Sequence, residues 1–365
     1  MTAGDVVAAG AKPATTVFLI IRRMEASLYA ALAGLRQRYH VLDFFASTDS
    51  LPAFLSSAAA AVASGAASPP RAAVVGGAGP ARVDAAFLDA FPSVRCVISL
   101  AAGVDFIDLD ECARRGVVVA NSGRVYSADV ADHAVGLLLQ VLRRVSAADR
   151  FVRRGLWPSA VAREAAGAAA GEYYPLGTKL GGKRVGVVGL GNIGSLIAKR
   201  LVALGCLVSY TSRRARGDAE VPYKYYPSVR DLAADADVLV VACALTKDTR
   251  RCVDRAVMDA LGAGGVIVNI SRGGNVDQAE LVDALREGRI AGAGLDVFES
   301  EPNVPPELCD MDNVVMTTHA GAFTNESMVD VGDLTVANLE AFFAGKPVHT
   351  PVQLPQAVKK AVVVP

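Results

Sequence analysis

Short runs of β-branched and other apolar residues alternate with stretches of helical periodicity along most of the chain. Two series of runs predict strands, near residues 15–21, 72–75, 95–99 and 116–121, and near residues 183–189, 207–211, 237–243, 265–271, 293–298 and 313–318. This alternation is typical of parallel sheets covered by helices. We therefore expect an α/β fold with two doubly wound parallel sheets, the second with the six strands of a complete dinucleotide-binding sheet.

An apolar stripe at helical spacing lies between the two series and predicts a helix over residues 127–145. It can be an ordinary core helix or a wall between domains, and the two interpretations are compatible. A second amphipathic helix is predicted over 328–345, where Gly345 and Pro347 stop it. Two alanine-rich stretches, 58–70 and 162–174, are interpreted as low-complexity insertions without chemistry.

Length and charge narrow the possible classes. A chain of 365 residues predicts about two domains, and 37 basic side chains balance 37 acidic ones, so nothing favours nucleic acid or an anionic membrane as a partner. The six cysteines are scattered singly without metal-ligand spacing and are interpreted as small buried apolar residues in a reducing compartment. The first sixteen residues lack a targeting pattern, "AVVVP" lacks a peroxisomal tripeptide, and no apolar run could cross a bilayer. We expect a soluble cytosolic protein with no metal.

The segment "KRVGVVGLGNIG" carries a GxGxxG pattern at Gly189, Gly191 and Gly194, directly after a predicted strand and before a predicted helix. That context makes a dinucleotide site the preferred interpretation over an unliganded turn. The first glycine permits the tight turn, the second lets the backbone approach a pyrophosphate, and the third allows close packing of helix on strand. Backbone N–H groups near Asn192 and Ile193 would face the phosphates.

The next strand ends in "SYTSRR", where an NAD-specific protein would place an acidic residue for the ribose hydroxyls. Ser212 offers a hydroxyl there, and Arg213 and Arg214 offer guanidinium groups suited to a ribose 2′-phosphate. This pattern favours NADPH as the cofactor. The alternative is that one or both arginines simply point into solvent.

Three side chains that follow the fingerprint in the sequence suit the reduction of a 2-oxo acid. They are Arg272 in "NISRGG", Glu301 in "DVFESEP" and His319 in "VVMTTHAG". A guanidinium binds a carboxylate and polarises a carbonyl, an imidazolium donates the proton, and a carboxylate keeps that imidazole protonated. Among the other histidines, His133 lies in the predicted helix directly after Asp132, and His40 and His349 have no acidic or arginine motif beside them. All three are interpreted as structural.

Six segments together resemble the D-isomer-specific 2-hydroxyacid dehydrogenase family: "LAAGVDFIDL", "VYSADVADHAVGLLLQVLRR", "GKRVGVVGLGNIG", "NISRGGNVDQAELVDAL", "AGAGLDVFESEP" and "VVMTTHAG". The chain is most similar to the plant NADPH-preferring glyoxylate/hydroxypyruvate reductases and hydroxyphenylpyruvate reductases of that family. The similarity runs from about Val94 to Leu354 and is weak before it.

The resemblance implies a flavodoxin-like substrate domain, residues 1–125 and 327–365, and a Rossmann cofactor domain, residues 126–326, with the active site in the cleft between them. It implies the roles given above for the catalytic residues and further contacts for the ligands. In addition to Arg272, the residues that it implies for the substrate carboxylate are Ala102 and Gly103. The residues that it implies for the cofactor are Gly189, Leu190, Gly191, Asn192, Ile193, Gly194, Ser212, Arg213, Arg214, Ile270 and Asp296. Asp296 could equally be a strand-end carboxylate satisfied by the fold.

The chain departs from the family pattern at three places. Thr318 stands where many members have proline before the histidine, which leaves the backbone less restrained. Phe106 stands where a polar residue is common, and a bulky ring there could alter which substrate side chain fits. Trp157, the only tryptophan, lies in a segment that in relatives leans toward the partner subunit's cleft, although simple burial in a dimer interface explains it equally well.

These observations predict a homodimeric, NADPH-dependent reductase of small 2-oxo acids, with hydroxypyruvate and glyoxylate as leading substrates. A reductase of 4-hydroxyphenylpyruvate would use the same catalytic residues and differ only in pocket volume. A nucleotide-sensing corepressor is an alternative of another class, because fold alone does not determine function.

Overall fold

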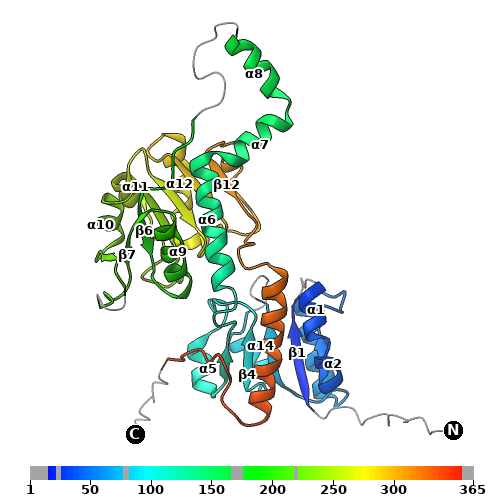
Figure 1. The fold of residues 1–365 in the computed structure, drawn as a ribbon. Coiled ribbons are helices and arrows are strands. Elements are labelled where there is room, and N and C mark those ends of the chain that lie inside the picture. The colour runs from blue at the N-terminus through cyan, green and yellow to red at the C-terminus, as the bar shows by residue number, and fades with distance from the viewer. Residues whose placement is uncertain (1–14, 22–25, 77–81, 166–175, 218–220, 356–365) are drawn as a thin grey trace, which may run out of the picture. The chain divides into compact units, whose positions relative to one another are not determined.

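The computed structural model describes residues 15–21, 26–76, 82–165, 176–217 and 221–355, and these form two compact units. The first unit takes the described residues up to Tyr126 and those from Thr324 onward, and the second takes the described residues of Ser127–Phe323. The sequence led us to expect divisions after residues 125 and 326. Each unit is described by itself below (Figure 1).

The sheet of the first unit has five parallel strands in the order β2-β1-β3-β4-β5, which is the flavodoxin-like order. The strands are β1 (Thr16–Ile20), β2 (His40–Asp43), β3 (Pro70–Val75), β4 (Cys96–Ser99) and β5 (Val118–Ala120). Four of them were predicted. The sequence pattern missed β2, because this short edge strand has no buried residue and therefore no apolar run.

The helices of this unit are α1 (Ala26–Leu32), α2 (Leu35–Arg38), α3 (Leu51–Ala63), α4 (Ala85–Ala90), α5 (Leu109–Arg115) and α14 (Asn325–Phe343). The interpretation of the first alanine-rich stretch as an insertion was wrong, since residues 58–63 form the second half of α3. Alanine is the strongest helix former, and Ser50 caps the helix by accepting from the Ala53 N–H at 3.4 Å. The second such stretch lies largely outside the described residues.

The C-terminal segment returns to the first unit through α14. That helix begins three residues before the expected start because Thr324 caps it, accepting from the Ser327 N–H at 3.1 Å. Gly332 permits close contact with α1, since a Cβ there would lie 2.3 Å from the Ala31 Cβ. Farther on, the Val352 N–H donates to the Val119 carbonyl beside β5 at 2.8 Å. The last described residues thus complete the first unit.

The sheet of the second unit has seven parallel strands in the order β12-β11-β10-β9-β6-β7-β8. They are β6 (Arg184–Val188), β7 (Leu207–Thr211), β8 (Lys224–Tyr225), β9 (Val238–Val241), β10 (Val266–Asn269), β11 (Gly292–Leu295) and β12 (Val314–Met316). The six predicted strands are all present. The expectation of six strands was wrong, because the sheet has β8 as a seventh strand at its edge. The two residues of β8 are too few for a periodic signal.

The helices of this unit are α6 (Ser127–Arg143), α7 (Val145–Arg153), α8 (Leu156–Ala165), α9 (Asn192–Ala203), α10 (Val229–Ala234), α11 (Arg255–Leu261), α12 (Gln278–Arg286) and α13 (Pro306–Cys309), with a 3-10 turn η1 (Gly273–Asn275). Successive strand residues face opposite sides. Val187 packs with Ala198 of α9, whereas Val188 packs with the core under α10, α11 and α12. Both faces of the sheet are therefore buried.

Helix α6 lies against β10, β11 and β12, as expected for a core helix. The glycines of β11 make the approach close. A Cβ on Gly292 would lie 2.9 Å from Cγ1 of Val141, and a Cβ on Gly294 would lie 3.1 Å from the Leu137 Cβ. The "AGAGL" run therefore has a packing reason, because it leaves room for two large side chains of α6.

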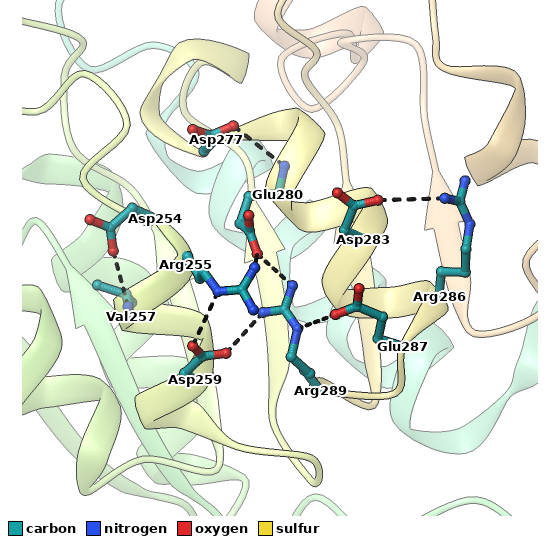
Figure 2. A network of polar contacts seen from close by, with 10 residues as sticks. All are labelled: Asp254, Arg255, Val257, Asp259, Asp277, Glu280, Asp283, Arg286, Glu287 and Arg289. Carbon is teal, nitrogen blue, oxygen red and sulfur yellow. Dashed lines mark hydrogen bonds and ion pairs between the residues drawn. The ribbon is translucent and has the colours of Figure 1, made fainter.

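A network of ion pairs joins α11 to α12 and the turn that follows (Figure 2). Arg289 binds Asp259 through Nη1 at 2.9 Å and Glu287 through Nε at 2.6 Å, and it also pairs with Glu280. Arg255 reaches the same Glu280 at 3.4 Å. These contacts hold two helices together on one outer face of the unit.

Candidate active site

The glycine-rich turn lies between β6 and α9, as predicted. Gly189 has φ +98°, and a Cβ on it would lie 2.8 Å from the Cys243 Cα. A Cβ on Gly194 would lie 2.0 Å from the Gly189 carbonyl oxygen. The fold itself therefore requires these two glycines, because no side chain fits at either place.

Gly191 has a different reason, since a Cβ there would meet nothing within 4 Å. It is the N-cap of α9, and no side chain caps the amides of the first turn. Asn192 beside it is exposed, whereas the Leu190 side chain is buried and offers a ligand only its backbone. An open helix N-terminus with uncapped amides fits a dinucleotide pyrophosphate.

The loop after β7 carries the predicted ribose residues. Arg213 and Arg214 are exposed, and the Ser212 hydroxyl donates to the Arg214 carbonyl at 2.6 Å. Sequence reasoning missed one further arginine of this loop and one tyrosine that contacts it. Exposed Arg216 adds a third guanidinium, and Tyr225 of β8 donates from its hydroxyl to the Ser212 carbonyl at 3.3 Å. The third arginine was visible in "RRAR", but the tyrosine depended on the missed strand.

Arg272 follows β10 and is half-buried. Its neighbour Gly273 explains its position, since a Cβ on Gly273 would lie 1.9 Å from the Phe298 carbonyl carbon. The arginine loop is thus pressed against the backbone that leads to Glu301. The Asn269 side chain braces the loop by donating to the Arg272 carbonyl at 3.0 Å.

His319 and Glu301 form a direct pair, with 2.8 Å between the imidazole Nδ1 and the carboxylate Oε2. Partial burial raises the pKa of Glu301, but hydrogen bonds from His319 and the Phe298 N–H, with the nearby Arg272 charge, outweigh it and hold the pKa below its ordinary 4.5. Glu301 is therefore an ionised acceptor, so Nδ1 of His319 carries a proton. The other ring nitrogen, Nε2, is left for a reacting group.

Asp296 follows β11 and is 2% exposed. Burial raises its pKa, but hydrogen bonds from His133, Thr317 and the backbone amides of Ala320 and Gly321 outweigh it and hold the pKa below the ordinary 3.8. Both carboxylate oxygens thus have partners within the fold, in accord with the satisfied strand-end interpretation. Its cofactor role stays a prediction.

The structure brings most of the predicted residues to one edge of one sheet. They follow the carboxyl ends of β6, β7, β10, β11 and β12, and Ile270, directly after β10, is buried so that only its backbone is available. Parallel α/β sheets bind ligands at this edge. Ala102 and Gly103 belong to the other unit, in the turn after β4, where the Asn121 side chain donates to the Ala102 carbonyl at 2.8 Å.

Several other predicted features can now be placed. The Phe106 ring packs against the core of the first unit, and Trp157 on α8 is 51% exposed. His349 is exposed, and His40 lies 3.4 Å from the Thr16 hydroxyl. The interpretation of all cysteines as buried is confirmed for Cys96, Cys112 and Cys206, whereas Cys243 and Cys252 are only partly buried. It was wrong for Cys309, which is exposed on α13.

The described residues contain no group of three or more His, Cys, Asp or Glu side chains placed to hold a metal ion. Among the described helices, none combines the length and the apolar character that crossing a membrane requires.

A parallel seven-stranded sheet, with an uncapped glycine turn after β6, defines a dinucleotide-binding α/β protein.

Comparison with known proteins agrees with this class. Residues 135–321 match the family described as "D-isomer specific 2-hydroxyacid dehydrogenase, NAD binding domain". Glyoxylate/hydroxypyruvate reductase A of Arabidopsis thaliana is 50% identical over 279 residues, which cover 76% of this chain and 84% of that protein. Hydroxyphenylpyruvate reductase of Plectranthus scutellarioides is 48% identical over 279 residues, with the same coverage of 76% and 84%.

A solved structure gives the same result. The NADPH-dependent glyoxylate/hydroxypyruvate reductase of Sinorhizobium meliloti, in complex with NADP and malonate, is similar with a TM-score of 0.79 and 33% identity, covering 93% of this chain and 96% of that one. The chain therefore belongs to the D-isomer specific 2-hydroxyacid dehydrogenase family. It is an oxidoreductase with an NAD(P)-binding Rossmann domain.

Proposed function

We propose that the protein reduces small 2-oxo acids by hydride transfer from NADPH, with hydroxypyruvate and glyoxylate as its substrates. One observation carries the proposal: a His319–Glu301 pair, with Arg272 beside it, lies on the same sheet edge as the dinucleotide turn. The names of the relatives in Arabidopsis and Sinorhizobium support the choice of substrates.

In this mechanism Arg272 binds the substrate carboxylate and polarises the carbonyl, which also sets the face of the ketone that reacts. Bound NADPH supplies the hydride for the carbonyl carbon. As negative charge develops on the oxygen, His319 gives it the proton from Nε2. Glu301 holds the Nδ1 proton and stabilises the imidazolium before the transfer. In the reverse direction neutral His319 accepts the proton.

The remaining predicted contacts form part of the proposal. The first unit would serve as the substrate domain, and the N–H groups of Ala102 and Gly103 would bind the substrate carboxylate. The second unit would hold the cofactor at the turn 189–194, at Ile270 and at Asp296. The domain limits proposed from the sequence are residues 1–125 and 327–365 for the first and 126–326 for the second.

The substrate proposal is tested by steady-state oxidation of NADPH with hydroxypyruvate, glyoxylate and 4-hydroxyphenylpyruvate. The aromatic acid is the second candidate, because a hydroxyphenylpyruvate reductase is 48% identical to this chain. We expect the highest kcat/KM with hydroxypyruvate. A higher value with the aromatic acid would transfer the proposal to that substrate, and no turnover with any of the three would contradict it.

Preference for NADPH is supported by the exposed guanidinium groups of Arg213 and Arg214 and by the absence of an acidic residue from "SYTSRR". Replacing both arginines with alanine should raise the KM for NADPH and leave that for NADH little changed, because only NADPH carries the 2′-phosphate. Arg230→Ala is a matched control elsewhere in the unit. Equal losses with both cofactors would contradict the proposed contact.

A homodimer in the cytosol is the proposed state of the enzyme. Helices α7 and α8 extend from the sheet of the second unit (Figure 1) and expose large apolar side chains, which are Val145, Val152, Leu156, Trp157 and Val161. Exposed apolar patches of this kind favour an interface between subunits. Replacing Trp157 and Val161 with serine should shift the mass measured by light scattering from dimer to monomer. Leu207→Ser, at another exposed apolar site, should leave the mass unchanged.

A further inference from the structure

One buried residue, Asp296, makes three hydrogen bonds to the backbone from His319 to Gly321. The Asp296 carbonyl accepts from the His319 N–H at 2.8 Å. Its carboxylate accepts from the Ala320 N–H at 2.8 Å through Oδ1 and from the Gly321 N–H at 3.0 Å through Oδ2. One residue therefore fixes the chain at and immediately after the proposed proton donor.

This restraint is needed because His319 has φ +55°, in the left-handed region. Non-glycine residues are strained there and persist only where the surroundings over-determine the conformation. The residue before His319 is Thr318, which is exposed and has no proline ring to restrain the backbone there. The conformation of His319 therefore depends on the position of the Asp296 carboxylate.

Asp296 is in turn held by a hydroxyl and an imidazole. The Thr317 hydroxyl donates to Oδ1 of Asp296 at 2.6 Å, and Nε2 of His133 lies 2.9 Å from the same hydroxyl oxygen and 3.3 Å from Oδ1. A hydroxyl has one proton, and the Thr317 hydroxyl uses it in the hydrogen bond to the ionised carboxylate. Nε2 of His133 must therefore be a donor, so a neutral His133 carries its proton on Nε2.

Helix α6 delivers His133 to this place through a matched register with β11. Val141 lies against Gly292, Leu137 against Gly294, and His133 donates to the Thr317–Asp296 pair. Four helical residues rise about 6 Å and two strand residues about 6.6 Å, so steps of four along α6 keep pace with steps of two along β11. The two glycines thus allow the helix close enough for His133 to reach Asp296.

We propose that Thr317 and His133 are positioning residues for the reaction: together they orient the Asp296 carboxylate, which holds His319 in the conformation that donates the proton. The inference rests on the proposed function, in which His319 is the proton donor. His133 is then more than the structural histidine expected from the sequence. Neither residue needs to touch substrate or cofactor for this role.

Thr317→Val tests the proposal, because valine keeps the shape and removes the hydroxyl. We expect kcat with hydroxypyruvate to fall about tenfold or more, since small misplacements of a reacting group are costly, while the KM for hydroxypyruvate, which depends on Arg272, stays within about twofold. Thr317→Ser should restore kcat to within about twofold of wild type. Thr318→Val, the exposed neighbour, is the matched control and should leave kcat unchanged. A Thr317→Val enzyme with wild-type kcat, or a serine variant as impaired as the valine variant, would overturn the proposal.

A second pair of variants covers the case in which Thr317→Val does not fold. His133→Gln keeps a donor near the position of Nε2 and should retain more kcat than His133→Leu, which keeps none. Equal kcat for the two would overturn the role of His133.

A spectroscopic measurement tests the same contacts without any substrate. The chain has four histidines, so 15N-histidine NMR can be assigned by substitution. In wild type a neutral His133 should appear as the Nε2–H tautomer. In Thr317→Val the Nε2–H keeps Oδ1 of Asp296 as acceptor, 3.3 Å away, but loses the hydroxyl oxygen, so its chemical shift should change, whereas Thr318→Val should leave the shift unchanged. A different tautomer in wild type would overturn the inference. If wild type turned over no 2-oxo acid and the NMR result held, the proposed function would fail while the described contacts stood.

Discussion

Two polar clusters of the second unit differ in almost every physical respect. The Arg289 cluster is built from long charged side chains on α11, α12 and the following turn, at the surface of the unit (Figure 2). The Asp296 cluster has one carboxylate, 2% exposed, held by a hydroxyl, an imidazole and backbone amides. The cluster with fewer charges is the one next to the candidate catalytic pair.

The difference shows which kind of polar contact can hold a reacting group in place. Exposed ion pairs lie in a high dielectric, lose strength with added salt, and rearrange at little cost. A buried carboxylate with its acceptor sites filled by short side chains and amides has no alternative arrangement of similar energy. The number of charges in a cluster is therefore a poor guide to function here, whereas burial and the type of donor are informative.

The largest expected effect belongs to the residue that the Asp296 cluster presents. His319→Ala should lower kcat by about 10²-fold or more, because it removes the general acid. His349→Ala, at an exposed histidine, is the control and should leave kcat unchanged. Steady-state rates with hydroxypyruvate give the comparison, and a near-normal rate for His319→Ala would mean that the proton comes from another group.

Asp296→Asn should have the next largest effect. The amide puts donors where the fold needs acceptors, so we expect the free energy of unfolding to fall by about 2–4 kcal/mol, with a loss of kcat. The folded-state pKa of Asp296 lies below 3.8, so its ionisation stabilises the fold above that pH and this contribution is lost as the pH falls through the folded-state pKa. Urea unfolding at pH 7 and near pH 3 should therefore show a narrowing gap between variant and wild type. A constant gap would contradict the buried-carboxylate account.

The Glu301–His319 pair should have a smaller effect on stability, with a defined pH dependence. Because the pKa of Glu301 is held below 4.5, its stabilising contribution is present above that pH and lost as the pH falls through the lowered value. Glu301→Gln should remove this dependence and lower kcat near pH 7, since the amide does not stabilise an imidazolium. Unfolding measurements between about pH 3 and 8 and rate measurements near pH 7 test both points. A variant that keeps the wild-type acid dependence would show that another group titrates.

The smallest effect is expected in the Arg289 cluster, where the partner side chains Arg255, Asp259 and Glu287 are exposed. Arg289→Met should lower the free energy of unfolding by less than about 1 kcal/mol, a loss that shrinks in about 1 M salt, and should leave kcat unchanged. Parallel unfolding of Asp259→Asn, which removes one partner of Arg289, provides the matched comparison. A loss as large as that of Asp296→Asn would remove the distinction between the two clusters.

Much of the second sheet could be predicted because its signals are local. The strands before Gly189 and Arg272 are continuous buried runs, and the glycine pattern and the reacting residues follow them directly in the sequence. The short strands β2 and β8 could not be predicted, because none of their residues is buried and they are too few to show a period. With β8 the pattern also missed Tyr225, which supports the ribose loop.

The contacts behind His319 could not be predicted, for a different reason. His133 and Thr317 lie 184 residues apart in the chain and meet only because the glycines of β11 admit α6. The sequence shows both residues and both glycines, but periodicity does not reveal which helix face meets which strand. A polar histidine on an apolar helix was therefore interpreted as structural.

Gly294 is a position at which a substitution would change the reaction rate without changing any group that binds a ligand. A methyl group at this position would meet the Leu137 Cβ at 3.1 Å, so α6 would have to shift slightly and would carry His133 with it. Natural variation or laboratory evolution at the middle of β11 could then change turnover while every group that contacts substrate or cofactor stays the same. In libraries aimed at speed rather than specificity, this glycine is a position to randomise.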